Sequence, residues 1–171
     1  ITGVRSEANE TFGVFAQRFD GIGQPSHEPT MTNGAPEGTQ VYPAVGIGSD
    51  GQTLVVWEDQ RPEMESTRLR ARWMDPMGTL GLEFTLSNSG SHTRPEVSID
   101  GRTGAALVSA IKNQQEAVLY RVSPGPTLAQ EVRSPLMPIS YNAALTNAAG
   151  TGHAIAYLAG VGADVKVQLT T

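Results

Sequence analysis

Short runs in which apolar and polar residues alternate recur along the chain, and they predict β-strands. In RLRARWM, the side chains of Leu69, Ala71 and Trp73 fall on one face and three arginines fall on the other. This period of two, together with β-branched and aromatic residues, is typical of strands that are buried on one face. We predict four strands that are consecutive neighbours in one antiparallel sheet: Tyr42–Ile47, Thr53–Glu58, Leu69–Met74 and Phe84–Ser87.

The same pattern predicts the core and leaves little room for helices. Residues 111–119 form the one stretch that could be helical, and we interpret them as a hairpin loop that leads into a strand. We therefore predict an almost entirely β protein with no helix longer than two turns. Within the four-stranded unit, the residues predicted to be buried are Val45, Val56, Leu69 and Ala71, with Trp57 at least mostly buried.

One strand–turn–strand pattern occurs twice, with a weaker third copy. Residues 41–61, VYPAVGIGSDGQTLVVWEDQR, and residues 93–113, TRPEVSIDGRTGAALVSAIKN, both contain a proline, a short strand, Asp-Gly and a second apolar strand. Pro43 and Pro95 are 52 residues apart. The third copy covers residues 140–160. Such self-similarity indicates an array of similar structural units.

The rest of the unit repeats as well. Asp20, Asp75 and Ser123 close three equivalent strands, VFAQRFD, RARWMD and LYRVS, and a fourth copy, VKVQLT, follows near the end. In the third copy of the first half, Asn142 takes the place of the proline. The start of the chain also aligns with the end of a later strand, which places Arg5 opposite Arg61.

The turns between these strands contain aspartate and glycine at recurring positions. Asp-Gly readily adopts positive φ, so SDGQ at residues 49–52 and IDGR at residues 99–102 predict two-residue hairpin turns. The turns that begin at Asp20 and Asp75 could also be read as metal loops. A calcium site needs six or more oxygen ligands, and one carboxylate per turn falls short, so we interpret them as tight hairpin turns.

Four strands in a unit of roughly 45 to 50 residues is the period of a β-propeller blade. A β-sandwich is the alternative, although sandwiches do not usually repeat one strand–turn–strand pattern. We predict an all-β fold of propeller-type blades with four antiparallel strands each, about three blades in all. The single domain, 1–171, divides into approximate units 1–40 (partial), 41–91, 92–138 and 139–171 (partial).

The ends of the chain add an expectation about partners. In blade order the sequence enters one unit late and leaves the last one early, and three blades do not close a ring. We expect a larger or oligomeric propeller, completed by other blades of a longer parent chain or by identical subunits. Open edges are normally covered, so the 171 residues purified alone should oligomerise or aggregate.

Composition narrows the classes of function. The 19 glycines and 11 prolines suit short strands joined by tight turns. The net charge of −5 argues against a nucleic-acid partner, which requires a basic surface. The absence of cysteine excludes disulfides, a thiol nucleophile and Cys-ligated metals. No apolar run approaches the length of a membrane span, and no leader peptide is recognisable.

Several runs resemble a repeat that is common in large secreted and cell-surface bacterial proteins. The repeat reads Tyr-Pro-x-Val, Asp-Gly, Val-Val-Trp-x-Asp-x-Arg and Tyr-Ala-Gln-Arg-Phe-Asp, and it is matched by YPAV, SDGQTLVVWEDQR, LRARWMDPMG and GVFAQRFDGIGQP. The resemblance spans nearly the whole chain. It implies a β-propeller-like array outside the cytoplasm, usually without a catalytic role. The second unit has Ala110 or a neighbour in place of the tryptophan, so one full Trp-x-Asp-x-Arg group is present.

Trp57, Asp59 and Arg61 are the candidate ligand-binding residues, because they share a strand face at i, i+2 and i+4. A tryptophan beside an aspartate and an arginine could stack on a sugar and hydrogen-bond to it, as in small propeller lectins. The alternative is structural: Trp57 would fill the core between blades while Asp59 and Arg61 pair with each other. Both interpretations are open at this point.

The sequence predicts no catalytic residues, no metal site and no cofactor. His27, His92 and His153 differ in their positions within the repeat, so we interpret them as solvated loop residues. Neither a Gly-x-Ser-x-Gly motif nor a clean copy of the sialidase Asp-box, Ser-x-Asp-x-Gly-x-x-Trp, is present.

We therefore expect a non-catalytic, secreted or cell-surface propeller module for binding, adhesion or scaffolding, whose ligand is a glycan or a surface protein. The alternatives are a carbohydrate-binding propeller lectin, and the propeller portion of an extracellular glycoside hydrolase whose acid and base lie elsewhere. No acidic pair recurs in the sequence, which favours the non-catalytic class.

Overall fold

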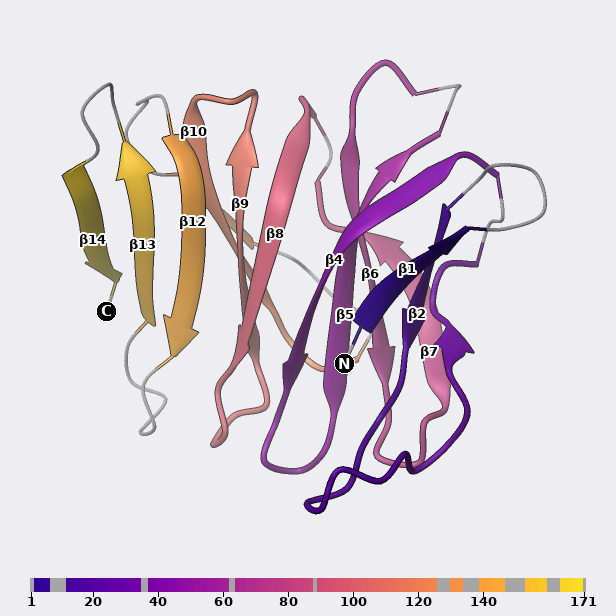
Figure 1. Cartoon of the computed structure of the whole chain (residues 1–171). Coiled ribbons are helices and arrows are strands. Elements are labelled where there is room, and N and C mark those ends of the chain that lie inside the picture. The colour runs from indigo at the N-terminus through magenta and orange to yellow at the C-terminus, as the bar shows by residue number, and fades with distance from the viewer. Residues whose placement is uncertain are drawn as a thin grey trace.

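The computed structural model describes residues 2–6, 12–34, 37–61, 64–87, 89–125, 130–133, 139–146, 153–159 and 164–170, with side chains between residues 12 and 125 of these ranges. All regular secondary structure in this part of the chain is β, as predicted (Figure 1). Among the described residues there is no helix of the length and hydropathy needed to cross a membrane.

The first sheet joins strands from the first two repeat units. Its order is β1-β2-β4-β5-β6-β7, and β3 pairs with β2 beside this path. The strands are β1 (Thr2–Ser6), β2 (Phe12–Ala16), β3 (Thr30–Met31), β4 (Thr39–Ile47), β5 (Thr53–Gln60), β6 (Arg68–Met74) and β7 (Leu80–Thr85).

Two further sheets follow in chain order and lie side by side across the molecule (Figure 1). The second has the order β11-β10-β9-β8 and the third has the order β12-β13-β14. Their strands are β8 (His92–Ile99), β9 (Ala106–Lys112), β10 (Glu116–Val122), β11 (Gln130–Arg133), β12 (Ile139–Thr146), β13 (His153–Ala159) and β14 (Asp164–Thr170).

The predicted four-stranded unit is confirmed, because β4, β5, β6 and β7 pair in sequence and each pair is antiparallel. The hairpin predicted for residues 111–119 is also confirmed, as β9 turns into β10 there. The last strand of the unit was placed too late, since β7 begins at Leu80. One link was not anticipated: β2 joins β4 in parallel through Phe12 and Thr39, so the partial first unit shares a sheet with the second.

The two Asp-Gly turns are longer than predicted. The main-chain N–H of Gly48 donates to the Gln52 carbonyl at 2.8 Å. Within this turn only Gly51 has a positive φ, of 81°. This is the three-residue turn with a left-handed glycine, rather than a two-residue turn with positive φ at both positions. After β8, Asp100 pairs with Ala105 across a four-residue loop that ends at Gly104.

The first strand of each complete unit contains a bulge at the same repeat position. The register of β4 shifts between Val41 and Ala44, and that of β8 shifts between Thr93 and Glu96. Tyr42 and Arg94, the residues before the repeated prolines, have φ of 49° and 54°. Positive φ is unfavourable for such residues, so the surrounding contacts must hold these two bulges in place.

The main core lies between the second and third repeat units. The face of β5 and β6 that carries Leu54, Val56 and Ala71 packs against β9 and β10, with Val97 and Ile99 of β8 at its margin. The predicted burial of Val56, Leu69 and Ala71 is confirmed, since each is 0% exposed. The prediction for Val45 is wrong, because its side chain is 36% exposed.

Candidate functional site

Trp57 lies in a second apolar cluster, between the first repeat unit and β5. It is 0% exposed and packs with Val14, Ala16, Val55 and Met74. The prediction that it is buried is confirmed. No face of its indole ring is open to solvent, so the ring lacks the free surface on which a sugar would stack. The ligand-binding role of the three candidate residues stays a prediction.

Asp59 and Arg61 form a bidentate ion pair just beyond the tryptophan. The Arg61 Nε lies 3.2 and 3.0 Å from the two Asp59 carboxylate oxygens, and its Nη2 lies 2.8 Å from Oδ2. Asp59 is 2% exposed. A second arginine, Arg70 of β6, places its Nε 3.8 Å from Asp59 Oδ2. The structure thus brings the predicted residues together, in an arrangement in which the charges satisfy one another.

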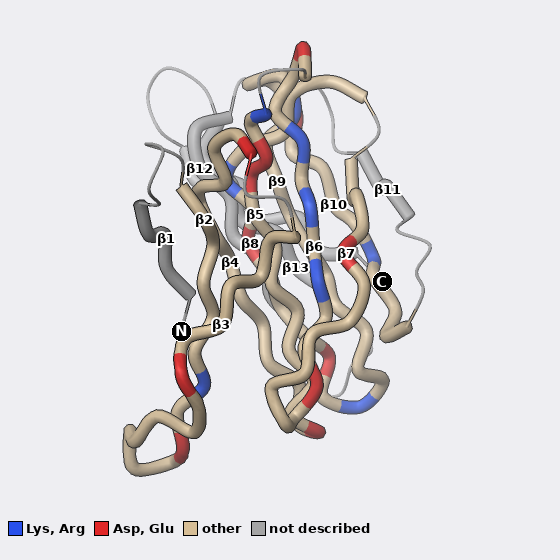
Figure 2. The backbone as a smooth tube through the Cα atoms, turned by 90° about the vertical axis from the view of Figure 1, so that its right-hand side faces the viewer, with Lys and Arg blue, Asp and Glu red and all other residues tan. Residues whose placement is uncertain are grey.

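The arginines of β6 form a stripe, and Figure 2 shows their alternating positions along the strand. They alternate with Leu69, Ala71 and Trp73, which belong to the main core, so the stripe lies on the opposite face. Arg70 donates from Nε to Glu83 Oε1 at 2.6 Å, and Glu83 Oε2 accepts from the main-chain N–H of Gly34 at 2.6 Å. Arg72 donates from Nη1 to the carbonyl of Thr32 at 3.0 Å. These bonds attach the segment after β3 to β6 and β7, so this stripe stabilises the contact between the first two units.

Glu58, on the other face of β5, connects neighbouring units. Its Oε1 accepts the main-chain N–H of Arg94 at 2.7 Å, and its Oε2 accepts from Gln60 Nε2 at 3.1 Å. Glu58 is 1% exposed, and burial raises the pKa of its carboxyl above 4.5 although both hydrogen bonds act in the opposite direction. The carboxylate supports the bulge of β8. Sequence reasoning missed it, because only the fold brings Arg94 to Glu58.

The prediction of solvated loop histidines is wrong for His92. This residue begins β8 and is 0% exposed. Its Nε2 lies 2.7 Å from the Tyr120 hydroxyl and its Nδ1 lies 3.1 Å from the Gly90 carbonyl. A neutral imidazole that donates from Nδ1 and accepts at Nε2 satisfies both contacts. His27 is half-buried beside the turn after β6, and the side chain of His153 lies outside the described residues.

The turn aspartates act as internal caps. Asp20 Oδ1 accepts the main-chain N–H of Ile22 at 3.0 Å and of Gln24 at 2.8 Å, and Asp75 Oδ1 makes the same pair of bonds to Met77 and Thr79. These bonds, led by that of Thr79, hold the pKa of Asp75 below 3.8. Among the described residues no cluster of three or more histidines and acids could hold a metal ion.

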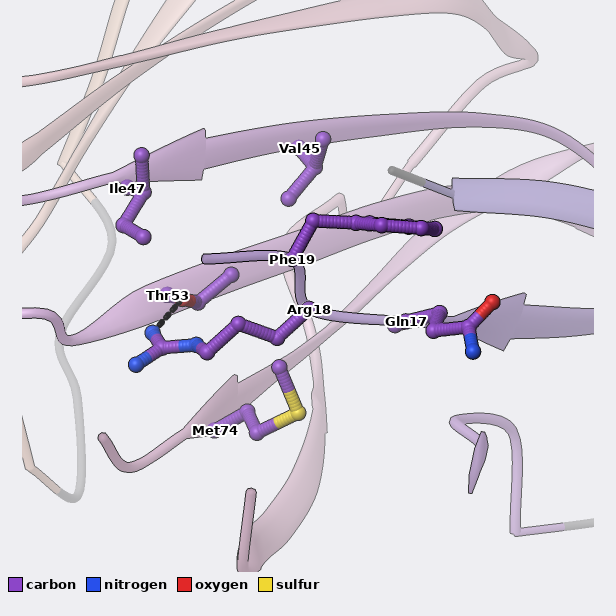
Figure 3. A pocket seen from close by; sticks show the side chains of 8 residues that line it. Gln17, Arg18, Phe19, Val45, Ile47, Thr53 and Met74 are labelled. Atoms are coloured by element: carbon purple, nitrogen blue, oxygen red, sulfur yellow. Dashed lines mark hydrogen bonds between the residues drawn. The ribbon is translucent and has the colours of Figure 1, made fainter. Parts of the chain in front are cut away.

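A largely apolar pocket of about 260 Å³ lies at the edge of β4 (Figure 3). Its lining is Ala16, Gln17, Arg18, Phe19, Val45, Ile47, Thr53 and Met74. The pocket was not anticipated, because alternation shows which residues share a face and not whether another strand covers that face.

Arg18 is the one charged residue that lines this pocket, and its guanidinium is bound to protein acceptors. It donates from Nη1 to the Pro76 carbonyl at 2.9 Å, and from Nη2 to Thr53 Oγ1 at 2.9 Å and to the carbonyl of Gly51. These bonds connect the turn after β4 to the turn after β6. The part of the pocket that is open to solvent is lined by the apolar side chains of Phe19, Val45 and Ile47.

Comparisons with known proteins support the fold and do not establish a function. No protein-family profile and no curated protein matches the sequence. Among solved structures, the chain resembles the Hadza microbial sialidase Hz136, with a TM-score of 0.63 and 13% identity, over 93% of this chain and 38% of that one. It also resembles a thermostable family-43 glycoside hydrolase, with a TM-score of 0.51 and 12% identity, over 97% of this chain and 69% of that one.

These likenesses agree with the internal repeat, and the fold is all-β with propeller-type blades. The chain spans 38% of the length of the sialidase that it resembles. At 13% and 12% identity the two likenesses concern the fold alone.

Proposed function

We propose that this chain is a non-catalytic part of a β-propeller that acts outside the cytoplasm and serves in binding, adhesion or scaffolding. The observation that supports this most strongly is how its acidic side chains are used. Most glycoside hydrolases use two carboxyl groups that flank the scissile bond, and sialidases differ in using a tyrosine as the nucleophile. Glu58 and Asp59, the two acids at the end of β5, point to opposite faces, and each is buried and bound to protein partners.

The other acidic side chains for which the structure gives hydrogen bonds also bind groups of the protein itself. The carboxylates of Asp20, Asp50, Asp75 and Asp100 accept main-chain N–H groups of their own turns. Glu83 is paired with Arg70. This use of carboxylates supports a framework that holds repeat units together. The location outside the cytoplasm rests on the resemblance of the repeat to those of secreted and surface proteins.

A second candidate is the propeller portion of an extracellular glycoside hydrolase. It is favoured by the two structural likenesses, one to a sialidase and one to a glycoside hydrolase. In that case the catalytic acid and base would be supplied by residues other than the acids described above, and the blades would carry the substrate-binding surface.

Two assays on the purified chain separate these functions. A panel of fluorogenic glycosides that includes a sialoside tests catalysis, and a glycan array tests binding. We expect no turnover above a heat-inactivated sample, whereas any turnover that is lost on heating would contradict the proposal, and its loss in Glu58→Gln would assign it to that carboxyl group. If a glycan binds, Arg61→Lys tests the predicted site, because lysine keeps the charge and loses the bidentate geometry. Loss of binding with unchanged stability would place the ligand at Trp57, Asp59 and Arg61.

A further inference from the structure

Arg68, the first residue of β6, is the arginine of the stripe that the structure leaves without an acceptor. Its side chain is half-buried, and within the described part of the chain it forms no hydrogen bond and no ion pair. Its Nε is fully buried and has no hydrogen-bond partner. Buried N–H groups almost always have an acceptor, so this one indicates an acceptor that the described residues do not supply.

The carboxylate nearest to Arg68 in the sheet is already saturated. Asp59 lies directly opposite Arg68 in the register of β5 and β6, so the two side chains share a face. Both oxygens of Asp59 accept from Arg61, and Oδ1 also lies 3.5 Å from Gln40 Nε2. Arg70 adds a third guanidinium, 3.8 Å from Asp59 Oδ2. One carboxylate therefore stands among three arginines, and its hydrogen bonds go to Arg61.

The second carboxylate of this region, Glu83, is taken up by Arg70. Its Oε1 accepts from Arg70 Nε at 2.6 Å and from Nη2 at 2.5 Å, and its Oε2 accepts the Gly34 N–H. Glu65, in the loop before β6, is exposed and forms no ion pair with Arg68. The charge of Arg68 is thus uncompensated beside two further guanidinium groups, although the whole chain carries a net charge of −5. An anion bound here would relieve the repulsion among these groups.

The pair formed by Arg61 and Asp59 shows the geometry that such an anion could adopt. There the Nε and Nη2 of one guanidinium donate to the two oxygens of one carboxylate. Arg68 has the same donors, a buried Nε and two terminal nitrogens that are not buried. The fixed fork of a guanidinium matches two oxygens of one carboxylate, phosphate or sulfate group, and such charge-assisted bonds are among the strongest in proteins.

We propose that Arg68 is an anion-binding residue, which takes one oxyanion group of a ligand at the start of β6. Its Nε and one terminal nitrogen donate to two oxygens of that group, while Arg70 contributes a second positive charge to the same face. The site does not use the buried ring of Trp57, and Arg61 and Asp59 keep their own pairing. The inference goes beyond the proposed function, because it stands whether or not the chain binds a glycan.

The test titrates the full chain with sodium sulfate, phosphate and acetate, each against sodium chloride at the same ionic strength. NMR of the arginine Nε–H groups follows the site directly, and Arg68→Lys, which lacks this group, assigns the signal of Arg68. The rise in unfolding temperature with anion concentration gives the affinity, because a ligand that binds the folded chain stabilises it. Arg68→Gln removes the proposed donor. Arg121→Gln, at an exposed arginine of β10 that has no ion pair among the described residues, removes the same charge elsewhere.

We expect the Nε–H signal of Arg68 to shift and saturate with at least one of the three oxyanions and to stay in place with chloride. Arg68→Gln should weaken that binding by about tenfold or more, since a charge-assisted pair is lost, and Arg121→Gln should leave it unchanged. Saturation with acetate alone would identify a carboxylate ligand, and saturation with sulfate or phosphate alone a tetrahedral one; both results support the site. An Arg68 signal that saturates with none of the three anions overturns the proposal, as does equal weakening by the two glutamine variants.

Discussion

Two tryptophans fill equivalent interfaces from opposite sides. Trp57 of β5 packs between the first two units, and its repeat counterpart in the next interface is Ala110. There the ring is supplied by Trp73 of β6, whose counterpart in the first interface is Arg18. Each of these two described interfaces therefore holds one tryptophan. This accounts for the third unit, residues 92–138, keeping the repeat without its tryptophan.

Replacement of Trp57 by alanine should lower the free energy of unfolding by about 3–5 kcal/mol, as for buried large aromatics. The indole is 0% exposed and contacts both units, so its loss leaves a cavity in the interface. Denaturant unfolding measures the change. Met77→Ala, at a side chain that is 85% exposed, is the control and should stay within about 0.5 kcal/mol of the parent chain. A loss below about 1 kcal/mol for Trp57→Ala would identify the ring as an exposed platform.

Glu58 predicts a pH dependence with a definite sign. Burial raises the pKa of its carboxyl above 4.5, so the folded protein keeps this proton at pH values at which the unfolded chain has released it. Over the window from 4.5 up to the raised pKa, its contribution to the free energy of unfolding falls as pH rises. Glu58→Gln keeps an oxygen acceptor for the Arg94 N–H and does not titrate.

We therefore expect the difference in unfolding free energy, Glu58→Gln minus parent, to increase as pH is raised through that window and to level off above it. Denaturant midpoints measured in steps from pH 4 to pH 8 give this difference, and all other titrating groups are common to both proteins. A difference that decreases with pH would mean that the Arg94 and Gln60 hydrogen bonds outweigh the cost of burying the charge.

Among the elements, the turns that follow β2 and β6 offer a matched pair. Gly23 and Gly78 close the same Asp-x-x-Gly turn, with φ of 83° and 87°. A Cβ on Gly23 would meet no atom within 4 Å, whereas one on Gly78 would lie 3.1 Å from the His27 ring. The two positions share the same backbone conformation and differ in the space around it.

Alanine at either position should destabilise the chain by about 1 kcal/mol, because positive φ disfavours a residue with a Cβ. Gly78→Ala should cost more than Gly23→Ala, since the His27 ring must also move. Thermal unfolding of the two variants and of Gly78→Ala combined with His27→Ala separates the effects. The excess should vanish in the double variant; if it persists, the contact with His27 is not its cause.

The repeat allowed the strands, their order within the unit and the burial of Trp57 to be predicted from sequence. Alternation could not show that Val45 is exposed, because it identifies a face of a strand and not what packs on it. The Asp-Gly pattern predicted a two-residue turn with two residues at positive φ. The turn is longer, because a single glycine at positive φ, Gly51, is enough to reverse the chain. His92 and Glu58 were misjudged or missed for a related reason: their partners, Tyr120 and Arg94, are brought to them only by the fold.

At the scale of the whole molecule, the account rests on one apolar core shared by two successive repeat units. In repeat architectures, stability is roughly a sum of the stability of each unit and of the interfaces between neighbours. Here the interface between β5–β6 and β9–β10 contains the largest group of buried side chains among the described residues. A substitution in the core of one unit should therefore lower the stability of the other unit as well.

Amide hydrogen exchange of the full chain, with and without Val108→Ala, tests this most directly. Val108 lies in β9 and is 0% exposed, and its side chain belongs to the shared core. If the two units share that core, the substitution will lower the protection of β5 and β6 as well as that of β9 and β10, and by a similar free energy. Loss of protection confined to β8, β9, β10 and β11, with β5 and β6 unchanged, would contradict the account.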